Sequence, residues 1–438
     1  MRLVVLALIA PFACHHGEPP PGPPASRTLE GPLVGRALAV AGGQLWVSAP
    51  GVDGAGGIYA FGATGGALAD AARSLEATEP GELGGAFAPC DVDGDGALDL
   101  LAGGPDRGDR GGAWWLAGPV GAAATADATF VDGLRREGHA GALVGCGDLD
   151  GDGIADAIVG APDTDSGGVA VRTGTLDLYR ASGDKFANVD TTWTDSHLGY
   201  RTGVAAADLD GDGIGDLAAG AAGVDRVHLV FGPVQGSVFT NQAGPTLSGP
   251  AGDGTGHALA AGDVDGDGQV DLVVGAPHGD AEQGGVWIVP GPFDPAGLDT
   301  PLSRLGTRIS GVAAGDQAGF SVAVPGDLDG DGADDVLVGA PFAGGVGAEA
   351  GAAYVVYRPA ELQGDLDSAA ALLLGDVALG RLGWAVAGGD LDGDGAPELA
   401  VSAPEADYDG VGVGAVFVFD GDGGGVVYPD AARARIDR

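Results

Sequence analysis

The chain has 438 residues, of which 87 are glycine and 27 are proline, and its formal net charge at pH 7 is −42. This much glycine argues against long helices, because each interior glycine costs roughly 0.5–1 kcal/mol relative to alanine, and a hydrophobic fraction of 45% argues against a disordered chain. The acidity argues against nucleic-acid binding, which needs clustered lysine and arginine. The apolar residues form short runs between glycine, aspartate and proline clusters, and this pattern predicts an all-β protein.

The first predicted element is an export signal over residues 1–13. Arg2 supplies a positive charge, and the apolar segment Leu3–Ile9 is too short to span a bilayer. The following Pro11-Phe12-Ala13-Cys14 resembles the lipobox of bacterial lipoproteins, in which the signal is cut before a cysteine that is then lipidated. The resemblance implies lipidation of Cys14, a proline-rich tether over residues 14–26 and an exported lipoprotein of the bacterial outer membrane or cell surface. A secreted protein is the alternative.

A repeated unit begins after the tether. Leu45–Pro50 (LWVSAP) matches Leu399–Pro404 (LAVSAP) near the other end of the chain. In the first copy a short turn, Gly42-Gly43-Gln44, stands where the later copies have an acidic loop. Self-similarity of this kind indicates a repeat architecture.

Six acidic loops of the form D-x-D-G-D-G-x-x-[DE] follow. Their starts are 55 to 64 residues apart. The loops are Asp91–Asp99, Asp148–Asp156, Asp208–Asp216, Asp263–Asp271, Asp327–Asp335 and Asp390–Glu398.

Short apolar strands flank every acidic loop. In the fifth copy, Phe320–Val324 precedes the loop, and the strand after it ends in Gly339-Ala340-Pro341. In the fourth copy a third strand, Gly285–Ile288, follows a glycine pair, and a fainter fourth strand covers Thr307–Ser310. Four-stranded antiparallel repeats of this length predict a seven-bladed β-propeller over residues 27–438, with metal loops in six blades. An open β-solenoid is the alternative, although its coils are usually shorter.

The spacing of the carboxylates predicts calcium, about six ions in all. Ca²⁺ takes six to eight oxygen ligands, and a loop with acids at positions 1, 3, 5 and 9, a backbone carbonyl at position 7 and glycine at position 6 can wrap one ion. An EF-hand would need glutamate at position 12, where these loops carry only alanine or valine. The predicted ligands are Asp91, Asp93, Asp95, Ala97, Asp99; Asp148, Asp150, Asp152, Ile154, Asp156; Asp208, Asp210, Asp212, Ile214, Asp216; Asp263, Asp265, Asp267, Gln269, Asp271; Asp327, Asp329, Asp331, Ala333, Asp335; and Asp390, Asp392, Asp394, Ala396, Glu398.

Together, the acidic loop, the Gly-Ala-Pro element and the aromatic-glycine element seen at Gly319-Phe320 resemble the FG-GAP repeat. That repeat builds the N-terminal propeller of integrin α chains and occurs in bacterial surface proteins. The resemblance implies that the acidic loops join the innermost strand to the second strand on one face. It also implies that ligands bind the opposite face, formed here by loops that include 106–111, 163–167 and 278–284.

Two further cysteines stand close to the acidic loops. Cys90 directly precedes Asp91, and Cys146 lies two residues before Asp148. Both are expected at the end of an innermost strand in neighbouring blades. An oxidising compartment favours a disulfide, but adjacent inner strands can diverge beyond the roughly 7 Å that a bridge allows between Cα atoms, so two separate buried thiols are the alternative.

The predicted function is ligand binding or adhesion at the cell surface, with structural calcium and no catalysis. The partner would be an unidentified protein or glycan, and the only membrane contact would be the lipid anchor. The sequence contains neither a G-x-S-x-G nucleophile elbow nor an H-E-x-x-H motif. An enzyme that acts on polysaccharide or lipid through the propeller funnel and a structural subunit of a surface complex are the alternatives.

Overall fold

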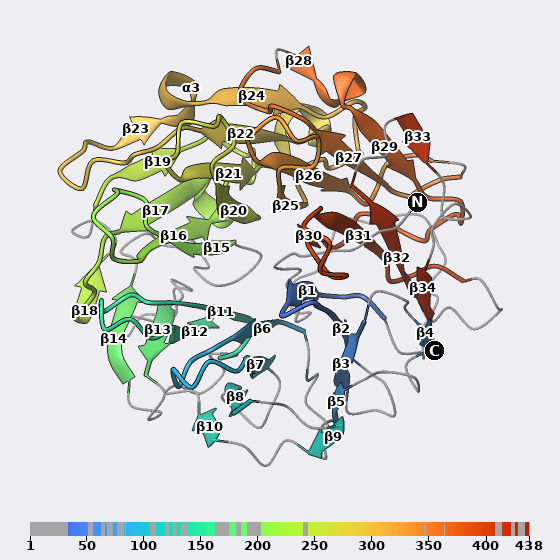
Figure 1. The fold of residues 1–438 in the computed structure, drawn as a ribbon. Coiled ribbons are helices and arrows are strands. Elements are labelled where there is room, and N and C mark those ends of the chain that lie inside the picture. Colours follow the sequence, from blue (N-terminus) through green and yellow to red (C-terminus); the bar gives the residue numbers. More distant parts are fainter. Residues whose placement is uncertain are drawn as a thin grey trace.

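The computed structural model describes residues 34–50, 56–62, 66–67, 73–76, 83, 85–105, 111–118, 122–125, 129–132, 139–162, 175–180, 185–190, 203–239, 244–345, 347–362, 364–407, 414–421, 425–427 and 434–437. They form an all-β structure of seven sheets arranged around a common centre (Figure 1). This arrangement is consistent with a β-propeller. The predicted signal, Cys14 and the tether lie outside the described residues.

Each sheet has four antiparallel strands taken from one continuous stretch of chain, numbered here from the innermost strand outward. Sheet 1 contains β1 (Leu38–Ala41), β2 (Gln44–Ala49), β3 (Gly57–Phe61) and β5 (Arg73–Glu76). Sheet 2 contains β6 (Phe87–Cys90), β7 (Asp99–Gly104), β8 (Gly112–Leu116) and β10 (Thr129–Asp132). Sheet 3 contains β11 (Leu143–Gly147), β12 (Asp156–Ala161), β13 (Thr175–Tyr179) and β14 (Lys185–Asp190).

The remaining sheets repeat this order. Sheet 4 contains β15 (Val204–Ala207), β16 (Asp216–Ala221), β17 (Arg226–Val230) and β19 (Thr246–Ser248). Sheet 5 contains β20 (Leu259–Gly262), β21 (Asp271–Gly275), β22 (Gly285–Val289) and β24 (Thr307–Ser310). Sheet 6 contains β25 (Ser321–Gly326), β26 (Asp335–Ala340), β27 (Ala352–Val356) and β29 (Ala371–Leu374). Sheet 7 contains β30 (Val386–Gly389), β31 (Glu398–Ala403), β32 (Ala415–Asp420) and β34 (Ala434–Asp437).

Among the described residues, six of the seven sheets carry a fifth strand that the four-stranded prediction lacked. In each case a short segment from the next repeat around the ring pairs in parallel with the outermost strand. An unpaired edge strand exposes a row of N–H and C=O groups, and the added strand covers it. The added strands are β9 (Ala122–Thr125), β18 (Gly236–Phe239), β23 (Thr300–Pro301), β28 (Gly364–Asp365), β33 (Gly425–Val427) and β4 (Gly66–Ala67).

A short strand of the first repeat joins the last sheet and so closes the ring. β4 from the first repeat pairs with β34 of the last, placing Gly66 opposite Ile436. One buried apolar cluster contains residues of sheets 1, 6 and 7, including Leu38 and Phe417, which are 1% exposed. Similar clusters fill the spaces between the other neighbouring sheets. The second strand of each sheet is therefore buried along most of its length, as the continuous apolar runs require.

Close contact between sheets explains the glycines of the repeat. A Cβ on Gly339 in β26 would collide with the carbonyl oxygen of Gly383, which precedes β30 of the next sheet. Gly275 meets Gly319 in the same way. The glycine of the Gly-Ala-Pro element and the glycine of the aromatic-glycine element thus touch across neighbouring sheets, where any larger residue would force the sheets apart.

Helical structure is sparse among the described residues. It comprises α2 (Gly279–Glu282), α3 (Leu302–Leu305), η3 (Ala222–Val224) and η4 (Leu366–Ser368). Within the described part of the chain, no helix has the length and apolar character needed to cross a membrane.

Candidate metal centres

The acidic loops are hairpin connections between the first and second strands of sheets 2 to 7. In sheet 6, β25 ends at Gly326, whose Cα partner is Asp335 at position 9 of the loop. The other five loops have the same register at position 9. Because every loop joins the same two strands of its sheet, all six lie at the same end of the sheets. In sheet 1, Gly42 and Gly43 form a tight turn at this place, as predicted.

Two glycines shape each loop. Gly266 and Gly268, at positions 4 and 6 of the fourth loop, have φ angles of +76° and +86°. A Cβ on Gly268 would meet no atom within 4 Å, so glycine is needed for its backbone conformation and not for space. Equivalent glycines have positive φ in the other five loops. The sequence predicted a sharp bend only at position 6, and the glycine that recurs at position 4 of every loop has the same backbone conformation.

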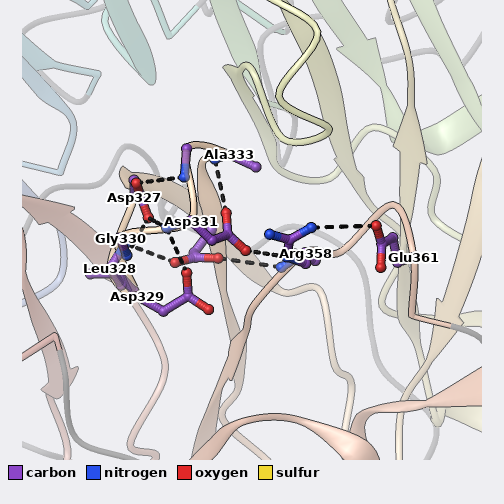
Figure 2. Close-up of polar contacts among 10 residues, drawn as sticks. Asp327, Leu328, Asp329, Gly330, Asp331, Ala333, Arg358 and Glu361 are labelled. Carbon is purple, nitrogen blue, oxygen red and sulfur yellow. Dashed lines mark hydrogen bonds and ion pairs between the residues drawn. The ribbon is translucent and has the colours of Figure 1, made fainter.

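Backbone amides hold the carboxylates of the loop in place (Figure 2). Asp327 accepts hydrogen bonds from the amides of Gly330 (2.7 Å) and Gly332 (2.9 Å). Burial acts against ionisation of Asp327, but these and two further amide hydrogen bonds outweigh it and lower its pKa. The amide of Ala333, at position 7, donates to Asp331 at 3.0 Å. The position-7 amides of the other loops bond position 5 in the same way.

Carboxylate oxygens converge within single loops. Acids of one loop each offer an oxygen, and these oxygens lie within 4.8 Å of one another. Five of the six such groups among the described residues are Asp91, Asp93 and Asp99; Asp148, Asp150 and Asp152; Asp208, Asp210 and Asp216; Asp263, Asp265 and Asp271; and Asp327, Asp329 and Asp335. Like charges at this separation repel one another, and a divalent cation would relieve that repulsion.

The acid at position 9 is buried and has a second role. Asp271 is 1% exposed; it accepts the amide of Val264 (3.0 Å) and that of Gly291 beyond the third strand (2.8 Å). It therefore ties the loop to the rest of its sheet. The hydrogen bond from an amide beyond the third strand was not predicted from the sequence. A Gly-Pro or Arg-Pro pair nevertheless recurs at this place, at 118–119, 232–233, 291–292 and 358–359.

Burial also shifts the acidity of position 9. It raises the pKa of Asp156, Asp216 and Asp271 to about 6, and neighbouring loop carboxylates add to the shift. The same causes raise the pKa of Asp335 and Glu398 to about 7. The ionised forms are thus disfavoured by the protein alone, and a bound cation would restore them.

The two carboxylate oxygens of Asp263 in the fourth loop show whether the loop suits a bound cation. Asp263 Oδ2 accepts the amide of Gly268 at 2.9 Å. Asp263 Oδ1 is buried and has no hydrogen-bond partner among the described residues. A buried carboxylate oxygen without a partner is costly, and a hard cation bound to it would remove that cost.

Arginines contact two of the acidic loops. Arg180, next to β13, pairs with Asp150 in the second loop. Arg358 pairs with Asp331 in the fifth loop and lies 3.5 Å from Glu361 (Figure 2). The sequence predicted neither contact, because each arginine lies more than 25 residues after the acid that it contacts.

Cys90 and Cys146, whose pairing the sequence left open, form a disulfide in the structure. Their Cα atoms are 6.7 Å apart. The bond joins β6 to β11, the innermost strands of two neighbouring sheets, beside the first and second acidic loops.

Comparisons with known proteins identify the repeats. The FG-GAP repeat model matches residues 200–240, 255–289, 318–356 and 382–419, and the FG-GAP-like repeat model matches residues 148–219. Integrin alpha pat-2 of Caenorhabditis briggsae is 33% identical over 222 residues, which are 47% of this chain and 18% of that protein. Integrin alpha-5 of Xenopus laevis is 38% identical over 182 residues, 39% of this chain and 15% of that protein.

Phosphatidylinositol-glycan-specific phospholipase D of Rattus norvegicus is also similar, with 35% identity over 173 residues, 37% of this chain and 20% of that protein. The matched part thus spans no more than 20% of any of these three relatives. The matched repeats contain five of the six acidic loops. The chain is an FG-GAP repeat protein, similar in its repeats to integrin alpha chains.

Proposed function

We propose that this chain is a seven-bladed β-propeller that binds calcium in six blades and binds a ligand at the cell surface. The observation that carries the proposal is the convergence of carboxylate oxygens in the acidic loops, at one end of a ring of FG-GAP repeats. Each of the seven sheets would be one blade, over residues 27–438. Sheet 1, whose two-residue turn replaces the loop, would bind no ion.

Calcium would act as a structural element. Positions 1 and 3 would supply carboxylate oxygens beside the first strand, and the buried acid at position 9 would connect the ion to the second strand. Position 5 and the position-7 carbonyl would complete an all-oxygen shell, the kind that Ca²⁺ prefers. The ion would thereby hold together the hairpin formed by the first and second strands of its blade. The opposite end of the blades would remain for a ligand, as the integrin resemblance implies.

An enzymatic role is the second candidate, and one relative favours it. The phospholipase D of Rattus norvegicus acts, by its name, on phosphatidylinositol glycan. However, the matched part is only 20% of that protein. The integrin matches cover no larger a share of their proteins, but integrin alpha chains of several animals are similar to this chain, and for that reason the ligand-binding role is preferred.

An array of glycans and extracellular proteins, probed with the full chain in calcium and in EGTA, distinguishes these roles. We expect retention on a small set of spots in calcium and its loss in EGTA, because the loops support the blades that present the ligand surface. Parallel incubations with polysaccharides and phosphatidylinositol glycan would be analysed for products. Turnover without stable retention would reject the binding module in favour of the enzyme.

We further propose that Cys14 carries the lipid anchor that its lipobox-like context predicts. In a bacterial host, Cys14→Ser should move the protein from the membrane fraction to the soluble fraction or the medium, because the anchor would be its only membrane contact. Mass spectrometry of the wild-type N-terminus provides the control. An unmodified Cys14 within an intact N-terminus would contradict the proposal.

A further inference from the structure

The second and fifth acidic loops each contain a positive charge supplied by the chain itself. Arg180, directly after β13, pairs with Asp150, and Arg358, shortly after β27, pairs with Asp331. Among the described residues, no basic side chain pairs with an acid of the first, third or fourth loop. The loops therefore share one backbone shape but differ in the charge that surrounds an ion.

Arg358 occupies a place that glycine fills in three other sheets. The amides of Gly118, Gly232 and Gly291 donate to the acid at position 9 of their own loops, and the amide of Arg358 donates to Asp335 at 3.3 Å. The φ angle of Arg358 is +47°, in a region that glycine adopts without strain and other residues rarely adopt. The backbone contact alone would thus be met more easily by glycine, and the guanidinium is what the arginine adds.

Each arginine contacts a carboxylate that is a predicted calcium ligand. Asp150 is at position 3 of the second loop, its side chain is 5% exposed, and its carboxylate converges with those of Asp148 and Asp152. Asp331 is at position 5 of the fifth loop, and its side chain is 14% exposed. A guanidinium on either acid neutralises one of the negative charges that would attract the ion.

Both arginines can leave their loop without burying an unpaired charge. The side chains of Arg180 and Arg358 are partly exposed to solvent. Arg358 also has a second partner outside the loop, because its Nη1 lies 3.5 Å from a carboxylate oxygen of the exposed Glu361 (Figure 2). Displacement of the guanidinium by a metal ion therefore costs little beyond the lost ion pair, and the exchange is reversible.

We propose that Arg180 and Arg358 are internal counter-ions that set the calcium affinity of the second and fifth loops. In the absence of calcium, each arginine neutralises part of the loop and holds its shape. Calcium then has to displace the guanidinium or bind beside it, and the affinity of such loops falls with the negative charge available to the ion. The second and fifth loops therefore fill at higher calcium concentrations than the third and fourth. This inference deepens the proposed calcium-binding role and rests on it.

Hydrogen exchange of the full chain, followed by mass spectrometry at graded calcium concentrations, reports on each loop separately. Peptides from the third and fourth loops are the internal reference. We expect the calcium concentration that gives half-maximal protection to be roughly tenfold higher in the second and fifth loops, as for one unit charge beside a divalent ion in a solvated loop. Equal midpoints in these four loops would overturn the inference.

Variants assign the effect to the arginines. Arg358→Gln should lower the calcium midpoint of the fifth loop to that of the fourth, and Arg180→Gln should do the same for the second loop. Arg358→Lys keeps the charge and should keep the high midpoint. Arg304→Gln is the matched control, because Arg304 is an exposed residue of α3 outside the loops, and it should change no midpoint. Unchanged midpoints in both glutamine variants of the loop arginines would reject their role.

The ion-free state provides a second readout. In EGTA, Arg358→Gln should speed exchange in the fifth loop and leave the fourth unchanged, because the internal counter-ion is lost. The calcium series also separates this inference from the proposed function. Calcium-dependent protection with one common midpoint would overturn the arginine role and leave the calcium role standing, whereas no calcium-dependent protection in any loop would reject both.

Discussion

Excess EGTA is expected to lower the melting temperature of the full chain on the order of 10 °C relative to 1 mM calcium. Extracellular sites of this kind bind with dissociation constants of roughly 10⁻⁴–10⁻³ M. Each filled site then contributes up to about 1.4 kcal/mol at that concentration, and six sites sum to several kcal/mol. Removing the ions leaves converging carboxylates in loops that join the innermost strands to the second strands. Differential scanning calorimetry measures the shift.

A single loop can be tested in the same assay. Asp263→Asn changes a side chain whose Oδ1 is buried without a hydrogen-bond partner, and it should remove one of about six ions in an equilibrium calcium titration. Asp294→Asn, outside the loops, should leave the count unchanged. Magnesium in place of calcium should restore less of the melting temperature, because Mg²⁺ demands a stricter geometry. The calcium proposal fails if the melt is the same in calcium and in EGTA.

Removing the Cys90–Cys146 disulfide is expected to destabilise the folded chain by up to about 4 kcal/mol in the chain-entropy model, given the sequence separation of 56 residues. The cross-link restricts the unfolded chain, and in the fold it joins the innermost strands β6 and β11. Urea unfolding in calcium would compare wild type with the double variant Cys90→Ser and Cys146→Ser.

Reductant provides the matched control. It should lower the stability of the wild type to that of the double variant and leave the double variant unchanged. Thiol labelling of the unfolded, unreduced protein tests the bond directly. Two labelled thiols, counted apart from Cys14, would show that the bridge is absent in solution.

Local sequence determined the acidic hairpins, because their shape depends on residues within nine positions of one another. Glycine at positions 4 and 6 sets the positive φ angles, and the alternating aspartates then accept amides of their own loop, as Asp327 does. The apolar run after each loop specifies a strand that is buried on both faces. The recurrence of these signals every 55 to 64 residues predicted the repeated sheets.

Tertiary structure decided the features that join distant residues. The fifth strands, including β4 on β34, depend on which backbone edge remains unpaired once the sheets pack, and no local pattern marks such short segments. The contact of Gly339 with Gly383 joins two neighbouring sheets, and the pairing of Arg358 with Asp331 joins two loops of one sheet. Each depends on the position of a neighbouring strand or sheet and not on its own sequence.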